Sequence, residues 1–145
     1  MVKRLALLAF TLSLLAGGSA MVSAKDEDAA GMTKQQADSL ISSKLTSVKA
    51  KSEIPKEFWD AMSLGSMADI GGNFDAGCTG QGPHTRLVAV ALSKNAVCAI
   101  VEQGGIAYFK TFYIYKKQDD GVKCVYHEMV NDQKRCDEVK KKLAG

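Results

Sequence analysis

The chain has 145 residues, of which 19 are basic and 16 acidic, and its formal net charge is +3 at pH 7. That length suits one compact domain. Removal of a leader that contains Lys3 and Arg4 would leave 17 basic residues against 16 acidic ones, and this near balance argues against a nucleic-acid partner or a membrane surface bound through bulk charge.

The N-terminus has the features of a secretory signal peptide. Lys3 and Arg4 make a basic start, residues 5–16 are an apolar run too short to span a bilayer, and Val22-Ser23-Ala24 offers the small residues of a cleavage site. We therefore predict a signal peptide over residues 1–24, with cleavage after Ala20 as the alternative. The protein is then periplasmic or secreted, with no stable membrane anchor after cleavage.

Residues 25–32 are short and charged, and we expect them to be disordered ahead of a single domain over residues 33–145. The domain opens with Thr33 and Gln36, which match a helix capping box. Apolar residues then recur at helical spacing and predict an amphipathic helix that ends before Lys49. These are Ala37, Leu40, Ile41, Leu45 and Val48.

A second helix is predicted to start at Pro55, a residue suited to a first helical turn. Phe58, Trp59 and Met62 form its apolar face before Gly65. We interpret Trp59 as a core residue, because it lies at helical spacing with other large apolar side chains.

Residues 65–83 contain six glycines in nineteen positions and have no regular pattern. They lack the endings of a phosphate-binding loop and the spacing of a calcium loop. Two interpretations stay open: a bridging loop held by Cys78, or a loop that also forms a recognition surface. In the second case Asp69, Asn73 and Asp75 are candidate binding residues.

Four β-branched and aromatic runs follow, and they predict a four-stranded antiparallel β-meander. Gly104-Gly105 and Asp120-Gly121 are typical of two-residue hairpin turns. The predicted strands cover residues 85–92, 96–103, 106–117 and 122–130.

These turns imply a register in which Val97 lies opposite Phe112, and Tyr115 lies opposite Tyr126. One face of the sheet is then mainly aliphatic and the other is aromatic. The aromatic face is either covered by helices or left as a recognition surface. Its candidate binding residues are Phe109, Tyr113, Tyr115 and Tyr126.

After the sheet, Asn131-Asp132 can cap a final helix that runs through Leu143. Cys136, Val139 and Leu143 fall on one face of that helix. The predicted fold class is therefore α+β, with N-terminal helices, a four-stranded antiparallel β-meander, a C-terminal helix and two disulfides.

The four cysteines predict two disulfides, because an even number in an exported chain is typical of such bridges. The predicted register places Cys98 and Cys124 on the order of 20 Å apart, too far to be joined. We favour Cys78 with Cys98 and Cys124 with Cys136, since these pairs close the shorter loops. The four cysteines are too widely spaced in the sequence for a typical zinc site, and no metal or cofactor is predicted.

No catalytic set is evident, because neither His84 nor His127 has a neighbouring nucleophile pattern. Our first hypothesis is an exported, non-catalytic protein that binds another protein, such as an inhibitor or immunity protein against an envelope-targeting enzyme. Only the general build supports this, by analogy.

Two alternatives are kept. The protein could be a carrier of a small apolar or aromatic ligand, which requires a cavity lined by Trp59, Phe109 and tyrosines. It could instead be a small secreted hydrolase, in which His84 converges with Asp75 or Asp69.

Overall fold

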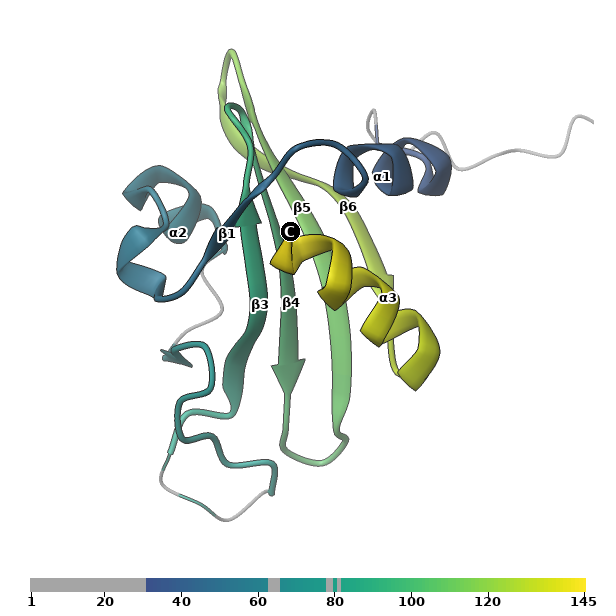
Figure 1. Ribbon diagram of the computed structural model, residues 1–145. Coiled ribbons are helices and arrows are strands. Elements are labelled where there is room, and N and C mark those ends of the chain that lie inside the picture. Colours follow the sequence, from purple (N-terminus) through teal and green to yellow (C-terminus); the bar gives the residue numbers. More distant parts are fainter. Residues whose placement is uncertain (1–30, 63–65, 78–79, 81) are drawn as a thin grey trace, which may run out of the picture.

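The structure of the protein is a computed structural model that describes residues 31–62, 66–77, 80 and 82–145 (Figure 1). The predicted signal peptide, and all of the predicted disordered N-terminus except residues 31 and 32, lie outside the described residues. In chain order the elements are α1 (Lys34–Ile41), β1 (Thr46–Val48), the 3-10 helix η1 (Lys51–Glu53), α2 (Lys56–Met62), β2 (Met67–Ala68), β3 (Thr85–Leu92), β4 (Ala96–Gln103), β5 (Phe109–Gln118), β6 (Gly121–Met129) and α3 (Gln133–Ala144).

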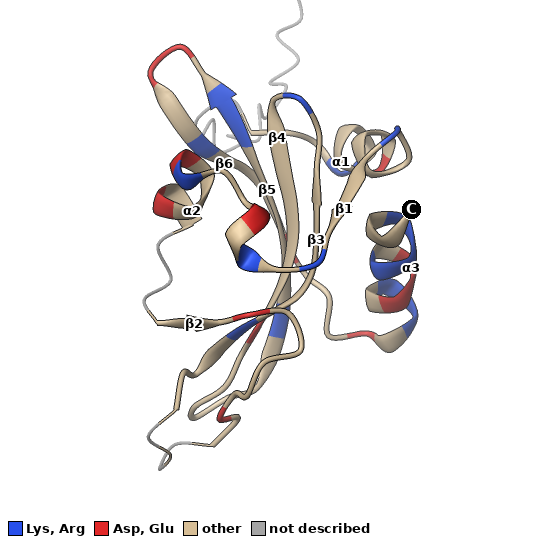
Figure 2. Ribbon diagram, turned by 60° about the vertical axis from the view of Figure 1, so that its left-hand side comes forward, with Lys and Arg blue, Asp and Glu red and all other residues tan. Residues whose placement is uncertain are grey.

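The described residues form a six-stranded sheet with helices on both faces (Figures 1 and 2). The strand order is β1-β3-β4-β5-β6, and β2 pairs with β3 outside this path. The β2–β3 pair is parallel and the other pairs are antiparallel. No helix among the described residues is long and apolar enough to cross a membrane.

Two hydrophobic layers hold the helices on the sheet, which confirms the predicted α+β class. On one face, here called the α1/α3 face, Ile41 and Leu143 pack with Phe112 of β5. On the other, here called the α2 face, Phe58 packs with Tyr115. Strand β4 is central and is buried from Ala96 through Glu102. Because both faces are covered there, β4 reads as a continuous apolar run rather than an alternating one.

The helix starts agree with the sequence. Thr33 caps α1, since its hydroxyl accepts a hydrogen bond from Gln36 N at 3.3 Å and the Gln36 side chain accepts one from Thr33 N at 2.8 Å. Asp132 caps α3 by accepting from Arg135 N at 2.8 Å. Side-chain caps supply partners for the first backbone N–H groups of a helix, and they depend on local sequence alone.

The prediction of four strands is wrong, because the predicted first helix is too long and part of it forms β1. Helix α1 ends at Ile41, where the Ser42 hydroxyl donates to Asp38 O at 2.7 Å. Val48 then lies opposite Val90 of β3 and is buried. Burial against β3 outweighs the helical spacing of the apolar residues. The sixth strand, β2, has only two residues and gives no periodic signal.

The first hairpin differs from the predicted two-residue turn. Gln103 pairs with Phe109, so the loop covers residues 104–108 and the pairing moves by three residues. A type I′ turn needs positive φ at both central residues. Only Gly105 of the Gly104-Gly105 pair has one, at 111°. Because the shift is by an odd number of residues, each β5 side chain lies on the opposite face of the sheet, relative to β4, from the predicted one. Val97, for example, lies opposite Tyr115 instead of Phe112.

The second hairpin also moves, with Gln118 opposite Gly121 and residues 119–120 in the loop. A β-bulge follows: Tyr115 pairs with Cys124, but Ile114 pairs with Tyr126. Val125 is the unpaired residue of the bulge. From Tyr126 onward, the side chains of β6 therefore lie on the faces opposite to those that they would have without the bulge. Tyr126 consequently lies on the α1/α3 face against Phe112, opposite to the prediction.

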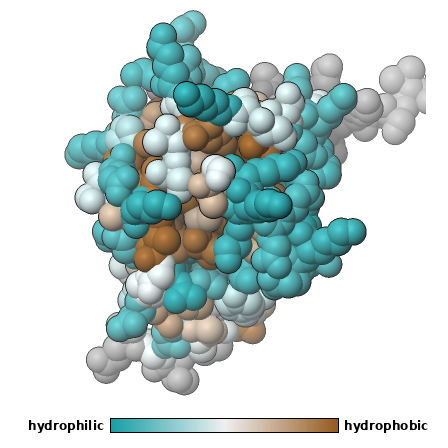
Figure 3. Space-filling view, viewed as in Figure 1, coloured by the Kyte–Doolittle hydropathy of each residue, from teal (hydrophilic) through white to brown (hydrophobic). Residues whose placement is uncertain are grey.

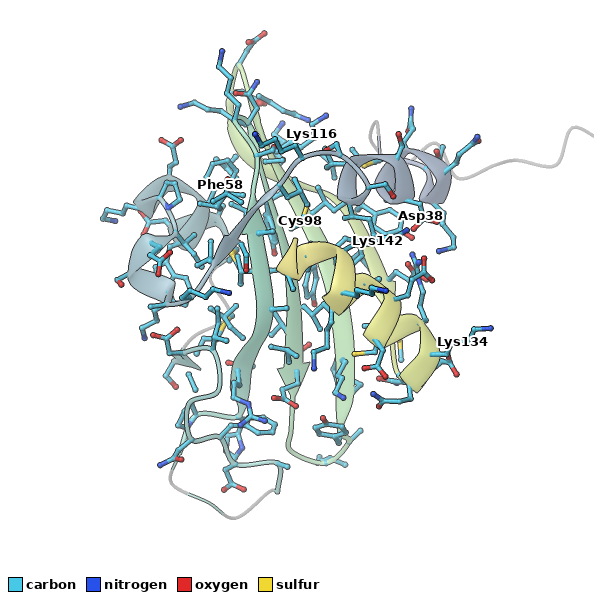
Figure 4. The ribbon with its side chains drawn as sticks, in the orientation of Figure 1. Asp38, Phe58, Cys98, Lys116, Lys134 and Lys142 are labelled. Atoms are coloured by element: carbon cyan, nitrogen blue, oxygen red, sulfur yellow. The ribbon has the colours of Figure 1, made fainter. Side chains whose placement is uncertain are left out.

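The predicted disulfides are contradicted, since Cys98, Cys124 and Cys136 are all free thiols and the described residues contain no bridge. Cys124 pairs with Tyr115 on the α2 face, whereas Cys136 is buried in the core of the α1/α3 face. The sheet therefore separates the two cysteines that we expected to join. Cys98, labelled in Figure 4, is also buried on the α1/α3 face, and Cys78 lies outside the described residues.

Thiol labelling of the native protein is expected to modify Cys124 within minutes, and Cys98 and Cys136 only after unfolding. Burial raises the pKa of both thiols, but Cys124 stays exposed, whereas Cys98 is covered and its pKa rises to about 12, so that little thiolate forms there. The measurement is maleimide labelling of the wild type at pH 8, with peptide mass mapping to assign the label to each cysteine. A mass two hydrogens lower per bridge, without labelling after unfolding, would contradict the free thiols.

Candidate functional site

Two loops meet at one end of the sheet and form what we call the tip: residues 72–77, before β3, and residues 104–108, between β4 and β5. Figures 1 and 2 show them side by side beyond the strand ends. Gly105 N donates to Ala76 O at 3.1 Å, and Gly104 N donates to His84 O at 2.8 Å. Asp75 N donates to Pro83 O at 3.0 Å. These backbone hydrogen bonds hold the two loops to each other and to the start of β3.

The tip requires glycine at position 104. A Cβ on Gly104 would lie 2.6 Å from both Ala76 Cα and Asp75 O, which is closer than packed atoms approach. The missing side chain therefore allows the two backbones to touch. This contact explains why Gly104 is not free to form the predicted hairpin turn.

A polar and aromatic cluster at the adjoining ends of β3 and β4 contacts both loops of the tip. Arg86 of β3 forms an ion pair with Glu102 of β4 and donates to Gly72 O at 3.0 Å. Tyr108 donates its hydroxyl hydrogen to Glu102 at 2.7 Å. The Arg86 guanidinium lies 5.0 Å from the centre of the Phe74 ring. One charged pair thus contacts both loops of the tip.

Burial and hydrogen bonds set the pKa values of the two acidic groups in this cluster, Glu102 and Tyr108. Burial acts to raise the pKa of Glu102, but hydrogen bonds from Arg86 and Tyr108 outweigh it and leave that pKa below its ordinary value. Burial and the hydrogen bond to Glu102 raise the pKa of Tyr108 to about 12. Glu102 is therefore ionised and Tyr108 neutral at neutral pH. Neither group titrates near pH 7, so the cluster suits structural support better than acid–base chemistry.

The outer surface of the 104–108 loop is apolar. Ile106 is 100% exposed and Tyr108 is 51% exposed. Asp75 is the only charged residue in the two loops, and its carboxylate accepts a hydrogen bond from Gly77 N at 2.8 Å. Figure 2 accordingly shows few charged positions at this end of the molecule. Ile106, Ala107 and Tyr108 are exposed in succession, and a contiguous exposed apolar patch is a candidate binding surface.

Of the predicted loop residues, the tip contains Asn73 and Asp75 but not Asp69. Asn73 is exposed. The Asp69 carboxylate accepts from Lys51 N at 2.8 Å and from Ile70 N at 2.7 Å. It therefore ties the loop to η1 and is occupied by backbone donors.

The four predicted aromatic residues do not form one surface. Phe109 begins β5 beside the tip, and Tyr113 and Tyr115 lie on the α2 face with ring centres 6.0 Å apart. Tyr115 is buried under α2, and Tyr126 lies on the opposite face. Tyr113 and Tyr115 thus pack with the core of the α2 face, and Tyr126 packs with the core of the α1/α3 face.

Sequence reasoning missed Ile106 and Tyr108, because both were placed inside a predicted strand. An apolar residue in an exposed loop has the same local pattern as one in a buried strand. The signal that could have located them is the double glycine before Ile106, which permits a backbone contact as well as a turn.

The hydrolase hypothesis needs a carboxylate beside His84. His84 Nδ1 instead donates to the Asp75 backbone carbonyl, 3.2 Å away, and Asp69 is held at η1. Among the described residues, no group of three or more His, Cys, Asp or Glu side chains is arranged to hold a metal ion.

Two surface hollows lie away from the tip. A groove of about 670 Å³ lies between α1 and the β5–β6 hairpin. A smaller hollow of about 220 Å³ lies between β1, β3 and the end of α3, where Figure 3 shows apolar side chains at the surface. Neither is lined by Trp59, Phe109 or a tyrosine, as the predicted ligand cavity would be.

Comparison with known proteins gives no match: no family model fits the sequence, and no curated protein or solved structure is significantly similar.

Proposed function

We propose that the protein is an exported, non-catalytic binding protein whose tip inserts into an apolar cleft of another protein. The exposed Ile106 side chain carries this proposal, since leaving it in water has a cost that a partner's apolar pocket would remove. Tyr108 beside it adds an aromatic anchor with a polar end, a residue type enriched at interfaces.

The tip is suited to tight binding because it is already ordered. Ordering a flexible loop on association costs free energy that a rigid loop does not lose again. Hydrogen bonds from Gly104 and Gly105, together with the Arg86–Glu102 pair, supply that rigidity. The exposed side chains of Ile106 and Tyr108 match the core of a protein interface, which is poor in charged residues and rich in aromatic ones.

A projecting tip fits a concave surface, such as an enzyme's active-site cleft. An inhibitor or an immunity protein against an envelope-targeting enzyme is the class that we favour, because it combines a projecting apolar loop with near-neutral charge. Selection of the partner then depends on shape and apolar contact more than on long-range attraction.

Export forms part of the proposal and is supported by the basic, apolar and small-residue regions of residues 1–24. Fractionation of the producing cells, followed by N-terminal mass analysis, tests it. A periplasmic or secreted chain that begins at Lys25 or Met21 would support export. A full-length chain in the cytoplasm would contradict it.

The partner can be sought by photo-crosslinking from the tip. A photoreactive amino acid at position 106 is expected to join the partner covalently, whereas the same group at position 134, on exposed Lys134 at the start of α3, is not (Figure 4). Labelling of one protein from position 106 only would support the proposal. Equal labelling from both positions, or labelling of lipid only, would contradict it.

Replacing Ile106 with aspartate is expected to weaken binding of the crosslinked partner by about 30-fold, with unchanged unfolding, because a central apolar anchor contributes about 2 kcal/mol. The measurement is titration calorimetry with the purified partner. Met129→Asp is the matched control, since Met129 is also a large apolar residue and is 65% exposed, but lies on β6 outside the tip. An equal loss in both variants would move the interface to the sheet.

A further inference from the structure

The groove between α1 and the β5–β6 hairpin lies at the other end of the sheet from the tip, so its role is separate from the proposed partner site (Figure 1). Its volume of about 670 Å³ is within the usual range for small-molecule sites. One side is formed by α1 and the residues that flank it, and the other by the C-terminal end of β5 and by Val125 in the middle of β6.

Part of the groove is apolar and well held. Met32, Leu40 and Val125 line it, and all three are half-buried and pack on the core of the α1/α3 face. Met32 N donates to Val125 O at 2.7 Å, which fixes the two sides to each other. These side chains offer a surface for a hydrocarbon chain.

Among the described residues that line the groove, the charged ones are all basic. These are Lys116 and Lys117, and the other polar side chains of this described lining are neutral. Lys117 forms an ion pair with Glu57 at 3.1 Å on the α2 side of the sheet. The remaining cation, Lys116, lies at the end of the sheet next to α1 (Figure 4).

Lys116 differs from the other half-buried lysines of the described residues. Lys142 forms an ion pair with Glu138 at 3.1 Å, and Lys110 lies 5.9 Å from the centre of the Tyr108 ring. Lys116 has neither an acidic nor an aromatic partner in the described part of the chain. A partly desolvated cation without a counter-charge favours an anion beside it.

We propose that this groove binds a single-chain amphiphile with an anionic head group, of the fatty-acid class. Its carboxylate pairs with Lys116, and its chain lies on Met32, Leu40 and Val125. The charge selects against neutral and cationic head groups, and the apolar surface selects against small hydrophilic anions.

Titration calorimetry with decanoate tests the head group and the chain separately. We expect one decanoate per protein, weaker binding of decanol, and none of acetate. Lys116→Gln should weaken decanoate roughly fivefold, which corresponds to one partly exposed ion pair, and leave decanol unchanged. Lys134→Gln, an exposed lysine outside the groove, should change neither.

A second variant tests the location. Ser39 lines the groove and is exposed on α1, so Ser39→Trp should fill the groove and abolish decanoate binding with the fold intact by circular dichroism. Gln35→Trp, exposed on α1 outside the groove, should bind as the wild type does. Equal affinities for decanoate and decanol, no effect of Lys116→Gln, or no binding at millimolar decanoate would each overturn the proposal. Decanoate binding that appears only when Asp26, Glu27 and Asp28 are replaced by neutral residues would also overturn it. That result would mean that the chain's own acidic residues occupy the groove.

Discussion

Replacing Arg135 with methionine is expected to lower the free energy of unfolding by about 1–3 kcal/mol, because Asp38 and Glu128 then keep only the more exposed Lys34 as a cationic partner. Arg135 Nη2 lies 2.7 Å from Asp38 Oδ1 and 2.8 Å from Glu128 Oε2. The Arg135 side chain is only 15% exposed, so solvent replaces little of this interaction. These contacts connect α3 with α1 and β6. Urea unfolding at pH 7 measures the loss, with Lys134→Met as the exposed neighbouring control.

The same variant is expected to be less sensitive to acid than the wild type. The Arg135 hydrogen bond holds the pKa of Glu128 below its ordinary value. For Asp38, burial opposes ionisation, but Arg135 and Lys34 outweigh it and lower the pKa. A carboxylate with a lowered pKa contributes stability above its unfolded-state pKa of about 4, and this contribution is lost as pH falls through the folded-state value.

Unfolding free energies between pH 7 and pH 2 test this dependence. The wild type should lose more stability below about pH 4 than Arg135→Met does, so the two curves should approach each other in acid. Parallel curves would show that the two carboxylates are not coupled to Arg135 in the folded protein.

Replacing Gly104 with valine is expected to lower the free energy of unfolding by about 3 kcal/mol and to loosen the tip. The new side chain would overlap the backbone at Asp75 and Ala76, and overpacking of this kind forces the chain to shift. The hydrogen bond from Gly105 N to Ala76 O should break. Urea unfolding measures the first effect, and faster amide hydrogen exchange at Gly105 measures the second.

Ala107→Val is the matched control, because Ala107 is exposed in the same loop. It should leave both unfolding and the Gly105 exchange rate near their wild-type values. If Gly104→Val weakens partner binding as much as Ile106→Asp while Ala107→Val does not, rigidity of the tip contributes to recognition. Unchanged exchange in Gly104→Val would mean that the two loops are not packed against each other.

The sequence predicted the elements whose signals are local. Strands β3 and β4 have the predicted bounds, and the helix starts at Thr33 and Asp132 are capped as expected. A cap involves residues three positions apart, and a strand of β-branched residues has its pattern within its own length. Such features do not depend on where the rest of the chain lies.

Tertiary packing decided how those elements pair. Gly104 contacts Ala76, far away in the sequence, and this contact replaces the predicted two-residue turn and shifts β5 by three residues. Because side chains alternate along a strand, the odd shift exchanged the predicted faces, and the bulge at Val125 then turned Tyr126 away from Tyr115.

The same register determines where the candidate site forms and which cysteines lie on opposite faces of the sheet. The exposed Ile106 and its supports, Arg86 and Glu102, come together only when the loops before β3 and after β4 fold over each other. Cys124 and Cys136 are free because the sheet lies between them. The sequence by itself determined strands β3 and β4, the capped helix starts and the overall α+β class. The tertiary structure alone decided which faces and loops meet, since each such contact depends on residues distant in the chain.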